Sequence, residues 1–332
     1  MTSTATAIPI SGSVLLAGAG QMAIDHARVL AALGVTLQVF GRGTQSATRF
    51  TKATGIPVGT GSLADQIAAA GHLPRTAIVA VSAHQLAEVG ATLLHKGVRR
   101  MLIEKPAALD LVEASQLLAA AQAVKAEVFV AYNRRFMASV LAAQEIIAAD
   151  GGPISIKFDF SELAGRILPL NKPQRELTTW FYGNSTHVVD LAFHLAGAPA
   201  RLSGDISGGS EIDPRTGIFT GHGLTQKGVH VSWHANWVAP GRWGVEVLTR
   251  KHRLILQPLE KLRLQSHAGF AEVEQTLNDA DDLAFKPGLL RQTRAFLTGE
   301  GREVRLLALA DHVCRMDAYE AIRRGGNWES KS

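Results

Sequence analysis

A turn with two glycines joins an apolar run at residues 13–17 to an Ala-rich stretch at residues 22–33. In a strand–turn–helix of this kind, Gly18 permits the tight turn and Gly20 lets the backbone approach a pyrophosphate. The small Ala23 allows the helix to pack closely on the strand. Other nucleotide folds also use glycine turns, but this context predicts a dinucleotide site with its phosphates at the helix N-terminus.

Residues 1–133 alternate short apolar runs with longer Ala-rich stretches, which is typical of βαβ units. The predicted strands cover residues 13–17, 36–40, 76–81, 101–103 and 127–132. The predicted helices cover residues 22–33, 63–70, 85–95 and 111–123. Because the strands are continuously apolar, we expect a parallel sheet that is covered on both faces.

Residues 134–332 have a different pattern and are expected to form a second, α+β domain. Alternating polar and apolar side chains, as in residues 229–237, predict a largely antiparallel sheet with one more polar face. The other predicted strands cover residues 154–161, 218–223, 243–249 and 252–256. The predicted helices cover residues 138–149, 289–297 and 306–323, and the polar residues 172–175 are expected to form a loop.

Composition argues against several classes of protein. The 332 residues suffice for two domains, and a net charge of +5 without a dense Lys/Arg run argues against nucleic-acid binding. The scattered histidines show no metal-ligand spacing, and no apolar run is long enough to span a membrane. Cys314, the single cysteine, excludes an intrachain disulfide and is expected in a helix core. With no recognisable signal peptide, we expect a cytoplasmic protein.

The end of the second predicted strand bears on the choice of cofactor. An NAD site usually has an acidic residue here to bind the ribose 2′-hydroxyl, but residues 41–46 contain no carboxylate. Arg42 could pair with a 2′-phosphate, helped by the hydroxyl of Thr44 or Ser46, or it could be a solvated loop residue. The missing acid favours NADP(H), and NAD(H) stays open.

Glu104-Lys105-Pro106 follows the fourth predicted strand of the first domain. A lysine is unusual at the buried end of a strand, because its ammonium group is costly to remove from water without a partner. Open parallel sheets bind ligands just outside these strand ends. Lys105 is therefore better explained by a functional site than by the core.

His187 and Asp190 are three residues apart, so they share one face if they begin a helix. A histidine in such a position could act as a general acid or base near neutral pH. His194, one helical step beyond Asp190, is the obvious rival candidate. Most histidines have structural roles, so spacing does not decide between them.

Four motifs in this order resemble those of the Gfo/Idh/MocA oxidoreductases, which include glucose–fructose oxidoreductase and inositol dehydrogenase. The motifs are residues 18–23, residues 104–106, residues 131–136 and residues 187–190. The resemblance covers nearly the whole chain, and Glu-Lys-Pro is its most specific part. It implies a doubly wound Rossmann domain, followed by an open antiparallel sheet that often forms an oligomer interface. A homodimer or homotetramer is therefore expected.

The resemblance also implies roles for individual residues. Lys105 would polarise the reacting oxygen, His187 would exchange the substrate's hydroxyl proton, and Asn133, Arg134 and Asp190 would bind the substrate. The substrate would be a sugar or a sugar-like alcohol or ketone, including nucleotide- or phosphate-linked ones. The expected cofactor-binding residues are Gly18, Gly20, Gln21, Met22, Ala23, Gly41, Arg42, Thr44, Ser82, Glu104 and Lys105.

Position 183 departs from the family's pattern. Many sugar and inositol dehydrogenases of this family have an aspartate four residues before the histidine, where this chain has Gly183. The polar residues 184–186 could replace it in part, or the substrate could differ. Two other functions stay open: a dinucleotide-binding regulatory protein without catalysis, and a glycosidase that uses tightly held NAD.

Overall fold

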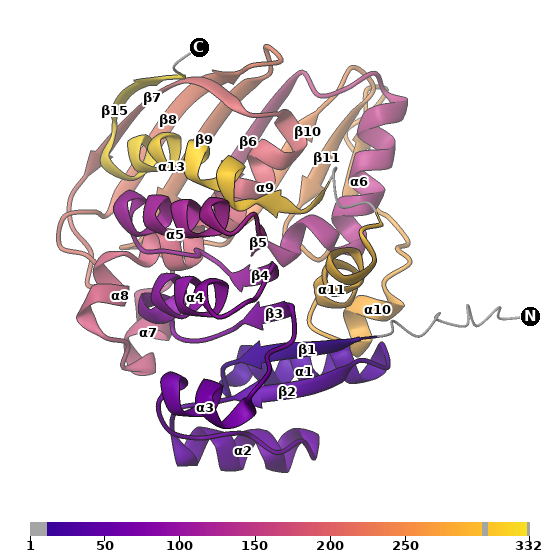
Figure 1. Ribbon diagram of the computed structural model, residues 1–332. Helices are drawn as coiled ribbons and strands as arrows, with labels where there is room; N and C mark the ends of the chain where they lie inside the picture. Colours follow the sequence, from indigo (N-terminus) through magenta and orange to yellow (C-terminus); the bar gives the residue numbers. More distant parts are fainter. Residues whose placement is uncertain (1–11, 301–304, 331–332) are drawn as a thin grey trace, which may run out of the picture. The chain divides into compact units, whose positions relative to one another are not determined.

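The computed structural model describes residues 12–300 and 305–330, which form two compact units (Figure 1). The first unit contains the described part of residues 1–131 and the described part of residues 283–309. The second contains residues 132–282 and the described residues from 310 onwards. The predicted boundary between residues 133 and 134 lies close to the point at which the chain first leaves the first unit, after residue 131. The prediction did not include the later return of residues 283–309 to the first unit.

The first unit is built on a six-stranded sheet in the described residues, in the order β14-β5-β4-β3-β1-β2. Neighbouring strands are parallel except that β14 is antiparallel to β5. The strands are β1 (Ser13–Ala17), β2 (Thr36–Phe40), β3 (Thr76–Val79), β4 (Arg100–Glu104), β5 (Glu127–Ala131) and β14 (Leu307–Ala308). Their apolar side chains are almost completely buried, as expected for a sheet covered on both faces.

Helices connect these strands and cover the sheet. They are α1 (Gln21–Ala32), α2 (Thr44–Thr54), α3 (Leu63–Ala70), α4 (Leu86–His95), α5 (Leu111–Ala123) and α11 (Leu289–Thr298). The chain runs from β1 to β2 in one direction across the sheet, and from β3 through β4 to β5 in the opposite one. Since such crossovers are right-handed, α1 covers one face and the neighbouring helices α4 and α5 cover the other (Figure 1). The unit is therefore a doubly wound Rossmann fold, which confirms the predicted fold class.

The second unit contains a nine-stranded sheet in the described residues, in the order β13-β12-β11-β10-β6-β9-β8-β7-β15. All its pairs are antiparallel except β6 with β9. The strands are β6 (Ser155–Asp159), β7 (Pro199–Ser207), β8 (Ile218–Thr225), β9 (His230–Asn236), β10 (Gly244–Leu248), β11 (His252–Leu256), β12 (Arg263–Ser266), β13 (Glu272–Glu274) and β15 (Gly326–Glu329). The predicted antiparallel sheet is thus confirmed.

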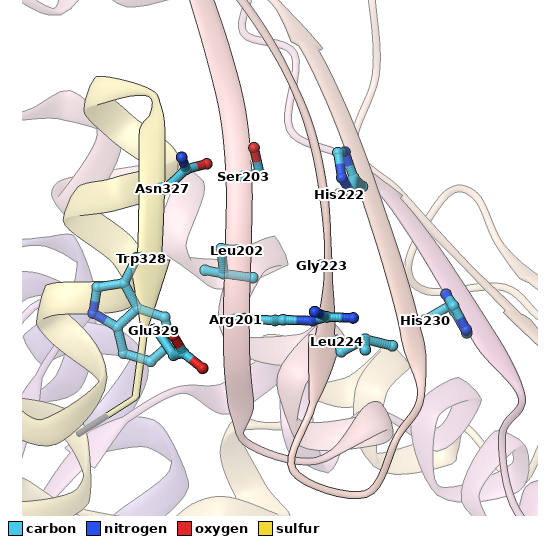
Figure 2. Close-up of a pocket in the computed structure, with 10 residues that line it drawn as sticks. All are labelled: Arg201, Leu202, Ser203, His222, Gly223, Leu224, His230, Asn327, Trp328 and Glu329. Atoms are coloured by element: carbon cyan, nitrogen blue, oxygen red, sulfur yellow. The ribbon is translucent and has the colours of Figure 1, made fainter. Parts of the chain in front are cut away.

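The two faces of this sheet differ. In β9 the side chains of Val231, Trp233 and Ala235 are buried, while the alternate residues His230 and His234 are exposed. On the exposed side, β7, β8, β9 and β15 surround a hollow of about 580 Å³ (Figure 2). This face therefore presents polar side chains and a shallow depression.

Helices and short turns cover the buried face of the sheet, and α9 contacts both β6 and β10. The helices are α6 (Ala138–Ala149), α7 (Ala164–Ile167), α8 (Gln174–Thr178), α9 (Thr186–Ala196), α10 (Ala280–Ala284), where the chain passes towards the first unit, and α13 (Leu309–Arg324). Short helical turns are η1 (Ala83–Gln85) in the first unit, and η2 (Asn133–Phe136), η3 (Leu168–Leu170) and η4 (Phe181–Ser185) in the second. Every described residue of α9 except His194 is buried.

Two expectations about this unit are wrong. Cys314 lies on the exposed side of α13 and not in a core, because the buried face of that helix carries Met316 and Tyr319 instead. Residues 174 and 175 begin the short helix α8, so the polar segment at 172–175 is only partly a loop.

Candidate functional site

The glycine turn lies where the strand order of the first sheet reverses, between β1 and β3. Gly18 has φ +130°, and a Cβ atom there would lie 2.2 Å from the carbonyl oxygen of Ala80, just after β3. Its N–H donates to the carbonyl oxygen of Phe40 at the end of β2, at 2.7 Å. Only glycine fits these two constraints. In open α/β sheets this crevice is where ligands bind.

The next residues leave room and hydrogen-bond donors for an anion. A Cβ atom on Gly20 would have no heavy atom within 4 Å, so the space in front of this residue is open. Gly20 is the N-cap of α1, and in the described part of the chain no side chain caps it and no acidic residue occupies the first turn. Gln21 and Met22 begin the helix, and Ala23 is fully buried against the sheet. A helix N-terminus of this kind suits a pyrophosphate.

The residues predicted to choose between NAD and NADP follow β2. Gly41 is buried, and a Cβ atom there would lie 2.9 Å from Cγ1 of Val58. Arg42 is exposed, and Thr44 begins α2, whose first turn contains no acidic residue among those described. An exposed arginine beside an uncapped helix N-terminus would attract a phosphate group.

Glu104 and Lys105 lie at the end of β4. The buried carboxylate of Glu104 contacts Nε2 of the fully buried His26 in α1, at 2.9 Å. Burial alone would raise the pKa of Glu104, but the contact with His26 and the charges of Lys105 and Lys286 hold it below its usual value. Glu104 is therefore an anion that ties α1 to β4 and attracts the half-buried Lys105. The Lys105–Pro106 peptide bond is cis.

The predicted residues of the first unit all lie at one edge of its sheet. They follow the carboxyl ends of β1, β2, β3 and β4, and Ser82 is the exposed N-cap of η1 after β3. Sequence reasoning missed Lys286, whose Nζ contacts Sδ of Met22 at 2.7 Å. Its position 264 residues from Met22 gives no sequence signal for this contact.

In the second unit a buried ion pair joins η2 to α9. Arg135 donates from Nε to Asp190 Oδ2 at 2.7 Å and from Nη2 to Oδ1 at 2.5 Å, and both residues are buried. Burial alone would raise the pKa of Asp190, but the charge and hydrogen bonds of Arg135 keep it below its usual value. This pair fixes Asn133 and Arg134 relative to His187. A substrate contact by Asp190 stays a prediction.

His187 lies between two aromatic rings near the start of α9. Its ring centroid is 5.9 Å from that of Tyr132 and 6.0 Å from that of Trp243, and only 5% of the residue is exposed. The guanidinium of Arg134 lies 5.5 Å from the centroid of the Trp243 ring, a cation–π geometry. The other candidate, His194, lies 3.0 Å from Nε2 of Gln144. The second unit thus brings together His187, Arg134 and Trp243.

Trp243 lines a cavity of about 500 Å³. Its walls include Trp243, Trp180, Asn184 and the buried Glu162, which follows β6. Sequence reasoning missed Glu162 because no motif includes it and its nearest predicted site residue, His187, lies 25 residues further along the chain (187 − 162). Trp243 is partly exposed and lines the cavity, and no sequence motif marks it as a site residue.

The described residues hold no group of three or more His, Cys, Asp or Glu side chains that could bind a metal ion. Within the same residues, none of the helices combines the length and apolar character needed to cross a bilayer.

Comparison with protein families gives a match over the glycine turn and the parallel sheet. Residues 13–132 match the model of an oxidoreductase family with an NAD-binding Rossmann fold, GFO_IDH_MocA. Over these residues the match confirms the resemblance inferred from the motifs. A search of curated proteins found no match.

Solved structures share the fold of nearly the entire chain at low sequence identity. Levoglucosan dehydrogenase in complex with NADH and L-sorbose has a TM-score of 0.77 and 16% identity, covering 97% of this chain and 99% of its own. An oxidoreductase from Agrobacterium radiobacter in complex with NAD+, L-tartaric acid and magnesium has a TM-score of 0.76 and 15% identity, covering 96% and 98%. UDP-N-acetylglucosamine 3-dehydrogenase from Acidithiobacillus ferrooxidans has a TM-score of 0.72 and 16% identity, covering 94% and 96%.

Proposed function

We propose that the chain oxidises or reduces a sugar or sugar-like substrate, starting from the match of residues 13–132 to the oxidoreductase family GFO_IDH_MocA, which has an NAD-binding Rossmann fold. The observation that carries the proposal is the placement of Lys105 at the same sheet edge as the dinucleotide turn. Three proteins of the same fold are named for, or were solved with, a sugar, a nucleotide sugar or a hydroxy acid.

The residues of the first unit fit a dinucleotide. Gly18 and Gly20 provide the tight turn and the open space, the N-terminus of α1 provides hydrogen-bond donors, and Lys286 adds positive charge near Met22. A bound nicotinamide supplies or accepts the hydride. The chain's own task is then to hold the substrate oxygen and to move its proton.

We assign these tasks to two residues. Lys105 binds the reacting oxygen through its Nζ, and in the reductive direction stabilises the charge that develops there. His187 takes the hydroxyl proton on an imidazole nitrogen during oxidation and returns it during reduction. The rings of Tyr132 and Trp243 limit the orientations open to His187, which favours proton transfer along one direction.

We further propose that NADP(H) is preferred over NAD(H). The support is the exposed Arg42 beside the uncapped start of α2, and the lack of a carboxylate in residues 41–46. The titration that checks this follows the melting temperature of the protein with NADP+, NADPH, NAD+ and NADH, since a ligand of the folded state raises it. We expect NADP(H) to give the larger shift, and Arg42→Ala to remove the difference.

Arg49→Ala, an exposed arginine in the middle of α2, is the matched control and should leave the preference unchanged. A larger shift with NAD(H) in the unaltered protein would show that Arg42 is only a surface residue. If no dinucleotide shifted the melting temperature of protein that carries no bound cofactor, the proposed oxidoreductase function would be rejected.

We also propose a homo-oligomer formed through the exposed face of the nine-stranded sheet, around the hollow between β9 and β15 (Figure 2). The partly exposed Trp328 lines this hollow, as do the charged residues Arg201 and Glu329. Sedimentation of the purified protein decides between monomer, dimer and tetramer, and location in the cytoplasm stays a prediction.

A further inference from the structure

Glu162 is a buried carboxylate in the wall of the cavity that Trp243, the neighbour of His187, also lines. It follows β6 by three residues, and 6% of it is exposed. The same cavity is lined by the aromatic side chains of Trp180 and Trp243 and by the amide of Asn184. A buried acidic group requires hydrogen-bond donors, because an unpaired buried charge is costly.

The donors come from the turn that leads into α9. Asn184 Nδ2 donates to both carboxylate oxygens of Glu162, each at 3.0 Å, and Ser185 Oγ donates to Oε1 at 2.8 Å. Asn184 and Ser185 directly follow Gly183, the position at which the resemblance implies an aspartate. The structure therefore brings a carboxylate from a different segment to the residues beside the one that lacks it.

We propose that Glu162 contacts the substrate and selects neutral polyhydroxylated molecules, in place of a carboxylate at position 183. This inference rests on the proposed function and names the substrate class of that site. A carboxylate only accepts hydrogen bonds, so it favours hydroxyl groups and repels acids. Arg166 and Arg242 also line the cavity, and the charge of Glu162 offsets their attraction for an acid. Trp180 and Trp243 line the cavity and can cover the apolar side of a sugar ring, as aromatic residues do when one side of a ligand is apolar.

A purely structural role for Glu162 makes a different prediction. A carboxylate near the start of α9 would stabilise the helix through its dipole, and its loss would lower the melting temperature without changing which ligands bind. Ligand selectivity therefore separates the two roles.

Position 183 allows a direct test of equivalence. A Cβ atom on Gly183 would have no heavy atom within 4 Å, and its φ lies outside the left-handed region. The backbone there therefore accepts the Cβ atom of an aspartate. If Glu162 supplies the missing carboxylate, Gly183→Asp should restore what Glu162→Gln removes.

The experiment titrates levoglucosan and L-tartrate into the full chain by calorimetry, with and without NADPH. The reduced dinucleotide cannot oxidise the alcohol, so only binding is measured. We expect Glu162→Gln to weaken levoglucosan binding about tenfold or more, as for a lost hydrogen bond to a charged group, and to strengthen tartrate binding. Glu162→Gln with Gly183→Asp should recover at least half of the lost levoglucosan affinity on a logarithmic scale.

Glu246→Gln is the matched control. It removes one charge from a hydrogen-bonded glutamate in the same unit, away from this cavity. If Glu162→Gln does not fold, Glu162→Asp is the alternative variant, because it keeps the charge and withdraws it by one methylene group. It should still weaken the binding of levoglucosan more than the binding of tartrate.

Equal levoglucosan affinity in Glu162→Gln and the unaltered protein would overturn the inference. The inference would also be overturned if Glu162→Gln lowered levoglucosan affinity, Gly183→Asp did not restore it, and the ratio of tartrate affinity to levoglucosan affinity stayed unchanged. That result would indicate that Glu162 only caps the helix. A protein that binds NADPH but neither probe also overturns it, and leaves dinucleotide binding intact. Failure of the proposed function appears separately, as no thermal shift with any dinucleotide.

Discussion

Gly18 and Gly20 have different reasons to be glycine. Gly18 has a positive φ and lies against the backbone of Ala80, so the fold itself requires a glycine at this position. Gly20 has an ordinary extended backbone and faces open space, so the fold does not require a glycine there and a bound ligand explains it better. The sequence pattern predicts both glycines, but only the structure separates the two causes.

Replacing each glycine by alanine should therefore give opposite results. Gly18→Ala should destabilise the protein by at least about 2 kcal/mol, because the methyl group overlaps the carbonyl of Ala80 at a strained φ. Gly20→Ala should change stability by less than about 1 kcal/mol and weaken dinucleotide binding by about tenfold or more. Urea unfolding and dinucleotide titration measure the two effects. Full dinucleotide affinity in Gly20→Ala would contradict a pyrophosphate at this turn.

The catalytic candidates could be predicted as residues, but their surroundings could not. Sequence motifs contain Glu104, Lys105, Tyr132 and His187, and the structure adds the contact of Glu104 with His26 and the packing of Tyr132 and Trp243 against His187. His26 and Trp243 come from distant segments, and no local pattern marks their contacts.

The helical elements follow closely from the sequence, since apolar spacing and turn residues determine them locally. The helices at Leu111–Ala123 and Ala138–Ala149 match the prediction residue for residue. The strand Pro199–Ser207 was not predicted, because its side chains alternate weakly and it contains glycine. The short strand β14 is defined only by its pairing with β5, which sequence periodicity does not contain.

The pairing of η2 with α9 is also a property of two elements and not of either one. Asp190→Asn should destabilise the protein by about 3–5 kcal/mol, because it leaves the buried guanidinium of Arg135 without its charge partner. It should also reduce turnover, since the pair fixes Arg134 relative to His187. Asp205→Asn, an exposed change on β7, should remain within about 0.5 kcal/mol of the unaltered protein. Unfolding in urea measures both, and equal stability would show that the pair is dispensable.

For the molecule, the order of elements predicts an α/β unit followed by an antiparallel α+β unit, and both are present. The return of residues 283–309 to the first unit is a long-range contact, so the sequence alone does not predict it. The same is true of Lys286, which this return brings to the dinucleotide turn. The first unit therefore requires a late segment of the chain to complete its site.

The most direct test measures the turnover of NADP+ with levoglucosan and a panel of related sugars, followed by the absorbance of the reduced dinucleotide. It compares the unaltered chain with Lys105→Ala and His187→Ala. We expect each variant to lose at least about a hundredfold in rate, as for loss of an acid–base group, while the dinucleotide thermal shift persists. The exposed Lys96→Ala and His95→Ala, at the end of α4, are matched controls and should turn over normally. Unchanged turnover in Lys105→Ala and His187→Ala would contradict the assignment of the hydride-transfer site.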